Sequence, residues 1–578
     1  MPLFCVLAIL FWGADHNPSG LSALRGMVSS RTLRLVVLGC LLTACEGVIG
    51  GAPSSDEPVV EAPVGLGAAC DPDAAPAADL IRVHRGVYLE ALGELLPASA
   101  VESAEASLRS LPRTQSGRFI AETEVASFDV VNAYVDIAST VAFAVSEGPA
   151  LSELSVCLSE LQSPPSATDE ACLDAFIDDF GMRVFRRPVH PDEHTQVREA
   201  YDIGASTSAS EGVATMLMAL LLEPQFLYYL ELEGEEVEPG VAALTSHEIA
   251  ARLARALWGS IPDQTLLDAA SLGFDGDEGH ARLQAEVDRM WDDPRSVTSI
   301  GQFYRDWLAL DTNPDADALV RFAAHATLEE EGGMDALFLG RTAFIEDDAL
   351  AETYGFEAGT RGEVLLDAER RAGLLTRAAW LRTTPVPDSN AGHVIHRGAA
   401  LSEVLCMPVP PPPPDAFPPD DPAEPTGGRQ TIRQRFADVT QEAQCSSCHV
   451  RLDNFGGAFG HYGSSGEWID QEEVEFDGEH YAMPIDASAV VAFGEEESVG
   501  LNGAVQLSEA AARSEYVAAC VGAQLTENFY ARPVGGGDAC LIQAARDELH
   551  AGRASLRQAF VALIRNPAFS LRSLPESP

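Results

Sequence analysis

The sequence predicts a mainly α-helical protein that is divided into several domains. Apolar residues recur at helical spacing through most of the chain, whereas long alternating stretches that would indicate β-strands are absent. Hydrophobic residues make up 46% of the 578 residues, which is enough to form real cores and is unlike a disordered protein. A chain of this length predicts about three to five domains.

The first half of the chain shows the clearest helical patterns. An apolar segment at residues 130–145 carries polar residues, so we expect a buried helix there rather than a membrane span. In the helix expected at residues 211–229, Pro224 predicts a kink or a boundary near Leu222. Thr245 and Glu248 form a capping-box pattern that begins another helix, and Pro262 opens the next one. Further helices in this half are expected near residues 81–96, 169–185, 192–201, 283–291 and 297–310.

The second half mixes helices with irregular segments. Residues 311–365 and 453–500 are rich in turn residues, and the second of these segments is expected to hold a small hairpin. The proline run at residues 410–414 predicts a stiff extended spacer. Helices are expected near residues 373–381, 396–405, 431–444, 508–529, 540–550 and 555–565.

The charge of the chain excludes one class of partner. The formal net charge is −51, and every fixed basic side chain is an arginine because the sequence has no lysine. Nucleic-acid binding requires clustered cations, which this composition lacks. Solubility outside the cytoplasm, or docking with a basic redox partner, fits the acidity better.

The N-terminal residues predict export. Arginines after Met27 are followed by a short apolar run at residues 35–42 and then by Thr43-Ala44-Cys45, which resembles the lipobox of bacterial lipoproteins. We therefore expect residues 1–45 to be a signal segment, with Met1 or Met27 as the start, Cys45 to be lipidated, and residues 46–78 to form a flexible tether. An uncleaved signal anchor is the alternative. Either way the protein is expected in the cell envelope, in the periplasm or at the outer membrane.

Export favours disulfide bonds among the remaining cysteines. Cys157 with Cys172, and Cys520 with Cys540, are close in the sequence and are the candidate local pairs. Elimination then leaves Cys70 with Cys406.

The pentapeptide at residues 445–449, Cys-Ser-Ser-Cys-His, matches the attachment motif of haem c. Cys445 and Cys448 would form the thioethers, and His449 would be the proximal ligand of the iron. Two other interpretations remain: a disulfide beside a surface histidine, or a zinc site. A zinc site would need two more ligands, and the chain has no second CxxC to supply them.

The sixth ligand of such a haem iron would determine its use. A methionine favours electron transfer, and Met483 in a downstream irregular segment is the candidate, although an ordinary packed methionine is the alternative. The other candidates are Met407, His461 and His480. His393 and His396 could share a metal across one helical turn, but two histidines at a helix start more often face solvent.

Several segments together resemble a family of large exported bacterial proteins. That family is built from serial domains of unknown function (numbered 1595, 1592, 1588 and 1585) and is described as cytochrome-c-like. The segments that carry the resemblance are Phe-Gly-Met-Arg-Val-Phe-Arg-Arg-Pro (180–188), Leu-Glu-Pro-Gln-Phe-Leu-Tyr (222–228), Ala-Arg-Leu-Ala-Arg-Ala-Leu-Trp (251–258), Ile-Pro-Asp (261–263), Gly-Leu-Leu-Thr (373–376), Arg-Gly (397–398) with the proline run, the CxxCH, and Asn-Pro-Ala-Phe (566–569).

The resemblance implies a domain order and a C-terminal helical region like cytochrome c. The expected domains are an N-terminal helical region (79–168), a 1595-like domain (169–235), a 1592-like domain (236–365), a 1588-like domain with the CxxCH (366–500) and a 1585-like domain (501–578). After the CxxCH, Asp453 and Trp468 fit the family pattern. Asn454, Gly460, Gly463 and Ile469 depart from it, at a proline, two acidic positions and an arginine.

We therefore expect an exported lipoprotein that carries one covalent haem c and transfers electrons at the cell envelope. The competing hypothesis is a non-catalytic envelope or surface-assembly lipoprotein, whose CxxCH is a disulfide or a relic. A third hypothesis is peroxide chemistry at an open haem position. Other catalytic motifs are absent: the sequence has no GxSxG, HExxH, P-loop, or GxGxxG after a strand.

Overall fold

The computed structural model describes residues 69–71, 75–76, 81–83, 85–111, 127–162, 166–311, 313–382, 389–409, 429–440, 443–550 and 555–574. The predicted signal segment with Cys45, most of the predicted tether and the proline run lie outside the described residues. The described part is mainly helical with a few short strands, which confirms the predicted fold class.

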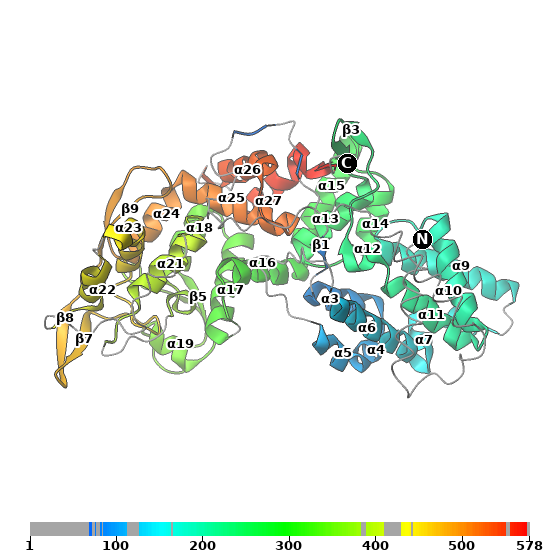
Figure 1. Cartoon of the computed structure of the whole chain (residues 1–578), viewed down its shortest axis with the longest axis horizontal. Helices are drawn as coiled ribbons and strands as arrows, with labels where there is room; N and C mark the ends of the chain where they lie inside the picture. The colour runs from blue at the N-terminus through cyan, green and yellow to red at the C-terminus, as the bar shows by residue number, and fades with distance from the viewer. Residues whose placement is uncertain are drawn as a thin grey trace.

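The elements form an arch with two limbs (Figure 1). The right-hand limb holds the N-terminal elements. They are β1 (Ile81–Arg82), α3 (Arg85–Leu95), α4 (Ala98–Ser103), α5 (Glu105–Ser110), α6 (Phe128–Ser146), α7 (Pro149–Leu154), α8 (Val156–Ser159), α9 (Ala167–Phe185), α10 (Pro191–Ala205), α11 (Ala209–Leu221), α12 (Pro224–Leu227) and β2 (Tyr228–Tyr229).

Helix α6 is long and apolar enough to cross a membrane, and no other described helix is. One face of α6 is buried, including Ile137, Val141 and Val145, and it packs in the same core as α11. Its acidic residues, Asp129 and Asp136, are exposed on the opposite face, as expected for the core helix of a folded domain. The expected boundary near Leu222 is present, since α11 ends at Leu221 and Pro224 begins the short α12.

The middle of the arch consists of the following elements: β3 (Glu236–Glu238), β4 (Val241–Ala243), α13 (Ser246–Trp258), α14 (Gln264–Ser271), α15 (Gly276–Trp291) and α16 (Pro294–Trp307), with α25 (Glu515–Tyr530), η3 (Gly536–Asp538), α26 (Ala539–His550), α27 (Leu556–Arg565), η4 (Pro567–Ser570) and β11 (Leu571–Ser573). The predicted capping box begins α13, because Thr245 and Glu248 bond reciprocally to each other's backbone N–H. Gly259, at a φ of 62°, ends it in the left-handed conformation that glycine tolerates.

The left-hand limb contains the remaining elements: α17 (Pro314–Leu328), α18 (Met334–Leu339), β5 (Thr342–Ile345), α19 (Asp348–Thr353), β6 (Gly362–Leu365), η2 (Leu374–Thr376), α20 (Ala378–Leu381), α21 (Val394–Val404), α22 (Ile432–Thr440), α23 (Ala443–Gly457), β7 (Gln471–Phe476), β8 (Glu479–Pro484), β9 (Ser488–Val491), β10 (Val499–Asn502) and α24 (Ala504–Arg513). The hairpin expected between residues 453 and 500 is β7–β8, and β9–β10 forms a second antiparallel pair there. The helix expected at residues 508–529 is two helices, because Ser514 ends α24 and caps α25.

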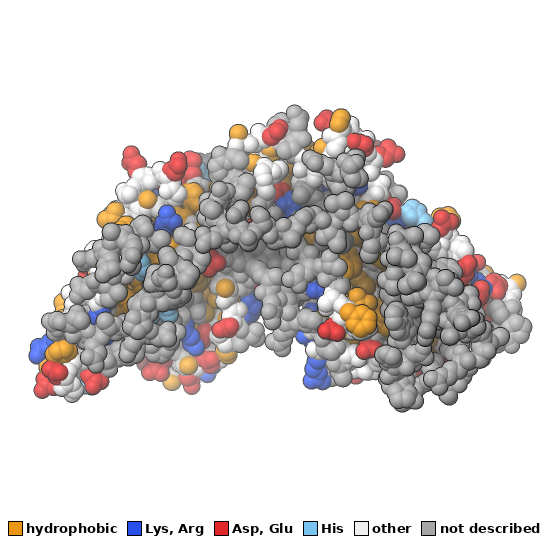
Figure 2. All heavy atoms as spheres, viewed as in Figure 1, with side chains coloured by type: hydrophobic (Ala, Val, Ile, Leu, Met, Phe, Trp, Pro, Cys, Tyr) orange, Lys and Arg blue, Asp and Glu red, His pale blue; other side chains and the backbone are white. Residues whose placement is uncertain are grey.

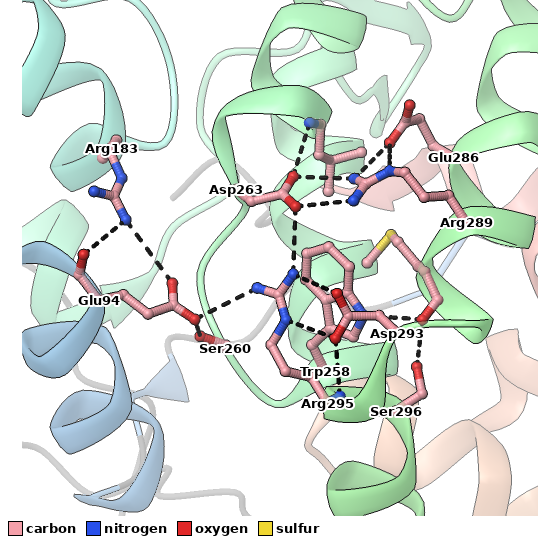
Figure 3. Close-up of polar contacts among 12 residues, drawn as sticks. Glu94, Arg183, Trp258, Ser260, Asp263, Glu286, Arg289, Asp293, Arg295 and Ser296 are labelled. Atoms are coloured by element: carbon pink, nitrogen blue, oxygen red, sulfur yellow. Dashed lines mark hydrogen bonds and ion pairs between the residues drawn. The ribbon is translucent and has the colours of Figure 1, made fainter.

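Ion pairs join the right-hand limb to the middle of the arch (Figure 3). Glu94 of α3 accepts from Ser260 at 3.2 Å and lies 3.4 Å from Arg295 of α16. The Arg295 guanidinium stacks on Trp258, with its carbon 3.5 Å from the ring centroid, and also pairs with Asp293. Each pair is partly exposed, so we expect the network to fix the orientation of the limb more than to add stability.

The C-terminal end of the chain returns to the middle of the arch. Strand β11 pairs with β4 and completes a three-stranded sheet in the order β11-β4-β3. The Ser573 N–H donates to the Pro76 carbonyl at 2.8 Å, so a segment from each end of the described chain lies at this sheet.

Three disulfide bonds connect the described cysteines. Cys157 pairs with Cys172, as predicted from their spacing. The expected bonds Cys520–Cys540 and Cys70–Cys406 are wrong, because the structure instead pairs Cys70 with Cys540 and Cys406 with Cys520. Cys520 lies in α25 beside the end of α21, whereas Cys540 is the second residue of α26 and bonds to Cys70 of the N-terminal segment. Closeness in the sequence therefore misled the prediction at these two positions.

Buried arginines bind main-chain carbonyls in the left-hand limb. Arg397 of α21 is 2% exposed and donates five hydrogen bonds to four carbonyl oxygens. The acceptors are Leu381, Phe459, Tyr462 and Gly463. Gly392 passes so close to this guanidinium that a Cβ there would lie 2.2 Å from it. Arg397 thus joins the Leu381 carbonyl at the end of α20 to three carbonyls after α23, each of which also accepts from a main-chain N–H.

We predict that Arg397→Lys destabilises this limb by roughly 3 kcal/mol or more. A lysine ammonium cannot reach four separate carbonyls, and each lost hydrogen bond from a charged donor costs about 1.5–3 kcal/mol. Denaturant unfolding followed by tryptophan fluorescence measures the loss. Arg513→Lys is the control, since Arg513 is 73% exposed; its effect is expected within about 0.5 kcal/mol. Equal midpoints for the two variants would contradict the assigned role.

Candidate functional site

The CxxCH pentapeptide lies in the first two turns of α23, which packs antiparallel against α21. Gly398 of α21 faces the Leu452 carbonyl, where a Cβ would lie 2.1 Å from the oxygen. Gly456 faces the Val394 carbonyl in the same way, at 1.9 Å. The two glycines therefore allow close contact of the helix backbones. Positions 445, 448 and 449 fall on one face of α23 because their spacing is i, i+3, i+4. The side chains at 443–448 lie outside the described part.

His449 is held by a carboxylate one turn further along α23. Its Nδ1 lies 3.4 Å from Oδ1 of Asp453, and Oδ2 of Asp453 accepts from the Thr440 hydroxyl at 2.8 Å. Nε2 of His449 has no hydrogen-bond partner among the described residues. When Nδ1 carries the proton toward a carboxylate, Nε2 keeps its lone pair and is available to a metal. His449 is thus arranged as a ligand would be.

Asp453 and Thr440 were not predicted as functional residues. Asp453 was noted only as a match to the family pattern, although its i+4 spacing from His449 was a usable signal. Thr440 could not be recognised, because it lies on α22, whereas His449 and Asp453 lie on α23.

The structure does not bring Met483 to His449. Met483 lies on β8 opposite Glu472 of β7, and the Glu472 carboxylate accepts from the Ile432 N–H at 2.7 Å. That contact is at the start of α22, whereas Thr440, which binds Asp453, is at its end. Eight residues of helix separate the two points by roughly 12 Å. Figure 1 shows the β7–β8 hairpin at the tip of the limb.

Met407 lies closer to the pentapeptide. It follows α21 at the end that runs alongside the first half of α23, and Arg451 of α23 donates to its carbonyl at 3.4 Å. Its side chain is 5% exposed, and its sulfur accepts from the Gly494 N–H at 3.4 Å. Met407 is therefore a packed core methionine whose sulfur already has a donor.

His393 and His396 do not form a metal pair in this structure. Their rings are stacked with centroids 3.6 Å apart, and Nδ1 of His393 accepts from the His396 N–H as the N-cap of α21. Burial, with smaller contributions from His396 and Arg397, lowers the pKa of His393 to about 4. His393 is therefore a neutral capping residue. The expected position of the pair at a helix start is confirmed, but the expected exposure to solvent is wrong for His393, which is half-buried.

The remaining candidate ligands lie elsewhere in the limb. His461 stacks on Trp468 with ring centroids 4.7 Å apart, and its Nδ1 lies 3.0 Å from the Ile469 carbonyl. His480 is exposed on β8. Within the described residues, no group of three or more His, Cys, Asp and Glu side chains could hold a metal ion.

We predict a specific pH dependence from His393. Because its pKa is below that of the unfolded chain, the unfolded state binds more protons between about pH 4 and 6.5, so stability falls as the pH falls through that window. His393→Asn keeps a side chain that can cap α21. It should nevertheless remove the part of the stability loss at low pH that comes from the protonation of His393 on unfolding. Urea midpoints at the two ends of the window test this. His280→Asn, an exposed histidine of α15, is the control. An unchanged slope in His393→Asn would contradict the assignment.

Comparison with protein-family models gives three matches on this chain. Residues 172–231 match a protein family of unknown function (DUF1595), residues 244–319 match DUF1592, and residues 371–472 match DUF1588. Each family is described only as a protein of unknown function. The pentapeptide lies within the DUF1588 match.

Comparisons with curated proteins and with solved structures found no match. The expected 1585-like region at residues 501–578, and the exact domain boundaries, stay predictions. The three matches occur in the order that the resemblance implied. The chain therefore belongs to the multidomain family of proteins that combine DUF1595, DUF1592 and DUF1588 domains.

Proposed function

We propose that this protein carries one covalent haem c on α23 and transfers electrons at the cell envelope. The observation that carries the proposal is the His449–Asp453–Thr440 chain of contacts beside the CxxCH sequence. A surface histidine beside a disulfide would not need an oriented carboxylate, whereas a ligand histidine usually has one.

The residue types at the start of α23 are those that hold a haem c. Cys445 and Cys448 would hold the porphyrin, and His449 would offer Nε2 to the iron while Asp453 keeps the proton on Nδ1. A bound haem would supply one-electron chemistry. The described arrangement provides no clear sixth ligand, because Met483 lies at the far end of α22 and the Met407 sulfur has a donor.

The proposed location and partners follow from the sequence. We propose export, lipidation at Cys45 and attachment to a membrane, with a basic protein as the redox partner. The net charge of −51 supports the choice of a basic partner. Carboxylates are visible on both limbs and at the top of the face drawn in Figure 2.

The first test is covalent attachment. Protein matured in a host competent for c-type haem should show a Soret band and keep its haem through a denaturing gel. The Cys445→Ser/Cys448→Ser double variant should lose both signals, because the thioethers cannot form. Ser446→Ala/Ser447→Ala, which changes only the two intervening residues, is the matched control.

A wild-type protein without covalent haem would overturn the proposal and would favour the non-catalytic envelope protein with a disulfide at this position. If haem is attached, Met483→Ala is expected to leave the spectrum and the potential unchanged in the arrangement described. A spectral change in that variant would instead identify Met483 as the distal ligand. Turnover of peroxide by the haem protein would instead favour an oxidoreductase whose haem iron has an open sixth position.

The second test concerns Asp453. Asp453→Asn keeps the shape of the side chain but removes the negative charge that stabilises the oxidised, more positive iron through His449. We expect the reduction potential to rise in this variant. Asp477→Asn, at an exposed turn with a φ of 54° that asparagine tolerates, is the control. Equal potentials in wild type and Asp453→Asn would contradict the role of Asp453 as the partner of His449.

A further inference from the structure

The arch contains two large apolar cores, and they are separate. One lies in the right-hand limb, between Ile81 and Tyr229, and the other runs through the middle of the arch into the left-hand limb, between Leu244 and Phe569. Among the described residues, only Ile261 and Ala531 from the rest of the chain are buried in the core of the right-hand limb. That limb is therefore a body with a core of its own.

The chain passes between these two bodies at one place. In the limb, β1 pairs with β2 and Ile81 lies opposite Tyr229, so the residue that enters the limb is beside the residue that leaves it. On the other side, the Pro76 carbonyl accepts from Ser573 of β11, and β11 shares one sheet with β4 and β3. Both crossings, after residue 76 and after residue 229, therefore join the same two sheets. Two adjacent crossings define a line about which a limb can rotate.

Some contacts between the bodies lie at these crossings. Arg187 of the limb is 2.9 Å from Glu233, which belongs to the second crossing. The guanidinium carbon of Arg255 on α13 is 4.8 Å from the ring centroid of Tyr229, the last residue of β2. A rotation displaces groups near its axis very little. These contacts can therefore persist while the limb turns.

A second contact between the bodies lies farther along α3 (Figure 3). Glu94 is nine residues along this helix from Arg85, which places it roughly 14 Å from the end that follows β1. Its carboxylate accepts from Ser260 at 3.2 Å and lies 3.4 Å from Arg295. Ile261, next to Ser260, is 1% exposed and packs in the core of the limb. We call Glu94, Ser260, Ile261 and Arg295 the latch.

The latch is weak for its position. The side chains of Glu94 and Arg295 are 22% and 24% exposed, so water competes for both partners and the ion pair adds little free energy. Its apolar part is the single side chain of Ile261. Interfaces between domains permit relative motion unless they are large and hydrophobic, and this one is neither.

We propose that the right-hand limb is hinged at the two crossings and that the latch holds it in the arched conformation. Release of Glu94 and Ile261 lets the limb rotate as a body, with both apolar cores intact. The spread of the arch then responds to a ligand that contacts both limbs, because such a ligand stabilises the spread at which both contacts form. This hinge is independent of the proposed haem.

The test measures the distance between the limbs in the full chain by double electron–electron resonance. Spin labels replace Ile203 of α10 and Leu365 of β6, which are 50% and 61% exposed, and enter as non-canonical amino acids so that the cysteines stay unchanged. Glu94→Gln removes the charge that pairs with Arg295 and should broaden the distance distribution. Salt at about 1 M should also broaden it in the wild type, since the Debye length falls to about 3 Å.

Two controls separate hinge motion from other effects. Glu286→Gln removes a carboxylate from the same network, but Glu286 pairs with Arg289 inside α15, so its distribution should equal that of the wild type. Labels at Leu365 and Val490 both lie in the left-hand limb, and the distance between them should stay the same in every variant.

Ile261→Ala combined with Glu94→Gln removes both parts of the latch and should broaden the distribution further than either change alone. An unchanged distribution in Glu94→Gln would contradict the role of the ion pair, and an unchanged distribution in the double variant would overturn the hinge. Broadening together with fast amide hydrogen exchange in α6 would also overturn it, because the limb would then be unfolding and not rotating.

Discussion

Hydrogen bonds from buried guanidinium groups to main-chain carbonyls are the interaction on which this structure depends. These guanidinium groups donate to buried carbonyls on separate segments of the chain and so hold those segments together. Arg397 serves four such oxygens, and Arg377, also buried, serves Gly340, Thr342 and Gly373 in the same limb. A planar group with five donors in fixed directions can do this, whereas an ammonium group cannot. The absence of lysine from the sequence is consistent with this use of arginine.

The same interaction places the candidate haem site. Arg397 holds the chain after α20 and the chain after α23 against α21, and α21 is the helix on which α23 packs. The glycines at 398 and 456 then bring the two helix backbones into contact. His449 and Asp453 lie on α23, so their relative position follows from one regular helix, whereas the position of Thr440 depends on how α22 packs against α23.

The helices could be predicted because capping and proline patterns involve residues that are close together in the sequence. The Thr245–Glu248 capping box and the boundary at Pro224 both depend on residues within one or two turns. The disulfides of Cys520 and Cys540 depend on which distant segments meet, and spacing carries no information about that.

The Cys70–Cys540 bond has a consequence for how the molecule responds to damage. It joins residues that are 470 positions apart, so both limbs of the arch lie inside one covalent ring. A single cleavage by a protease anywhere between these cysteines would open the ring but release no fragment. An anchor at Cys45 would be attached to the ring as a whole, and not to one limb. If the proposed anchor is present, a chain cleaved once would therefore keep its left-hand limb on the membrane for as long as this one bond stays oxidised.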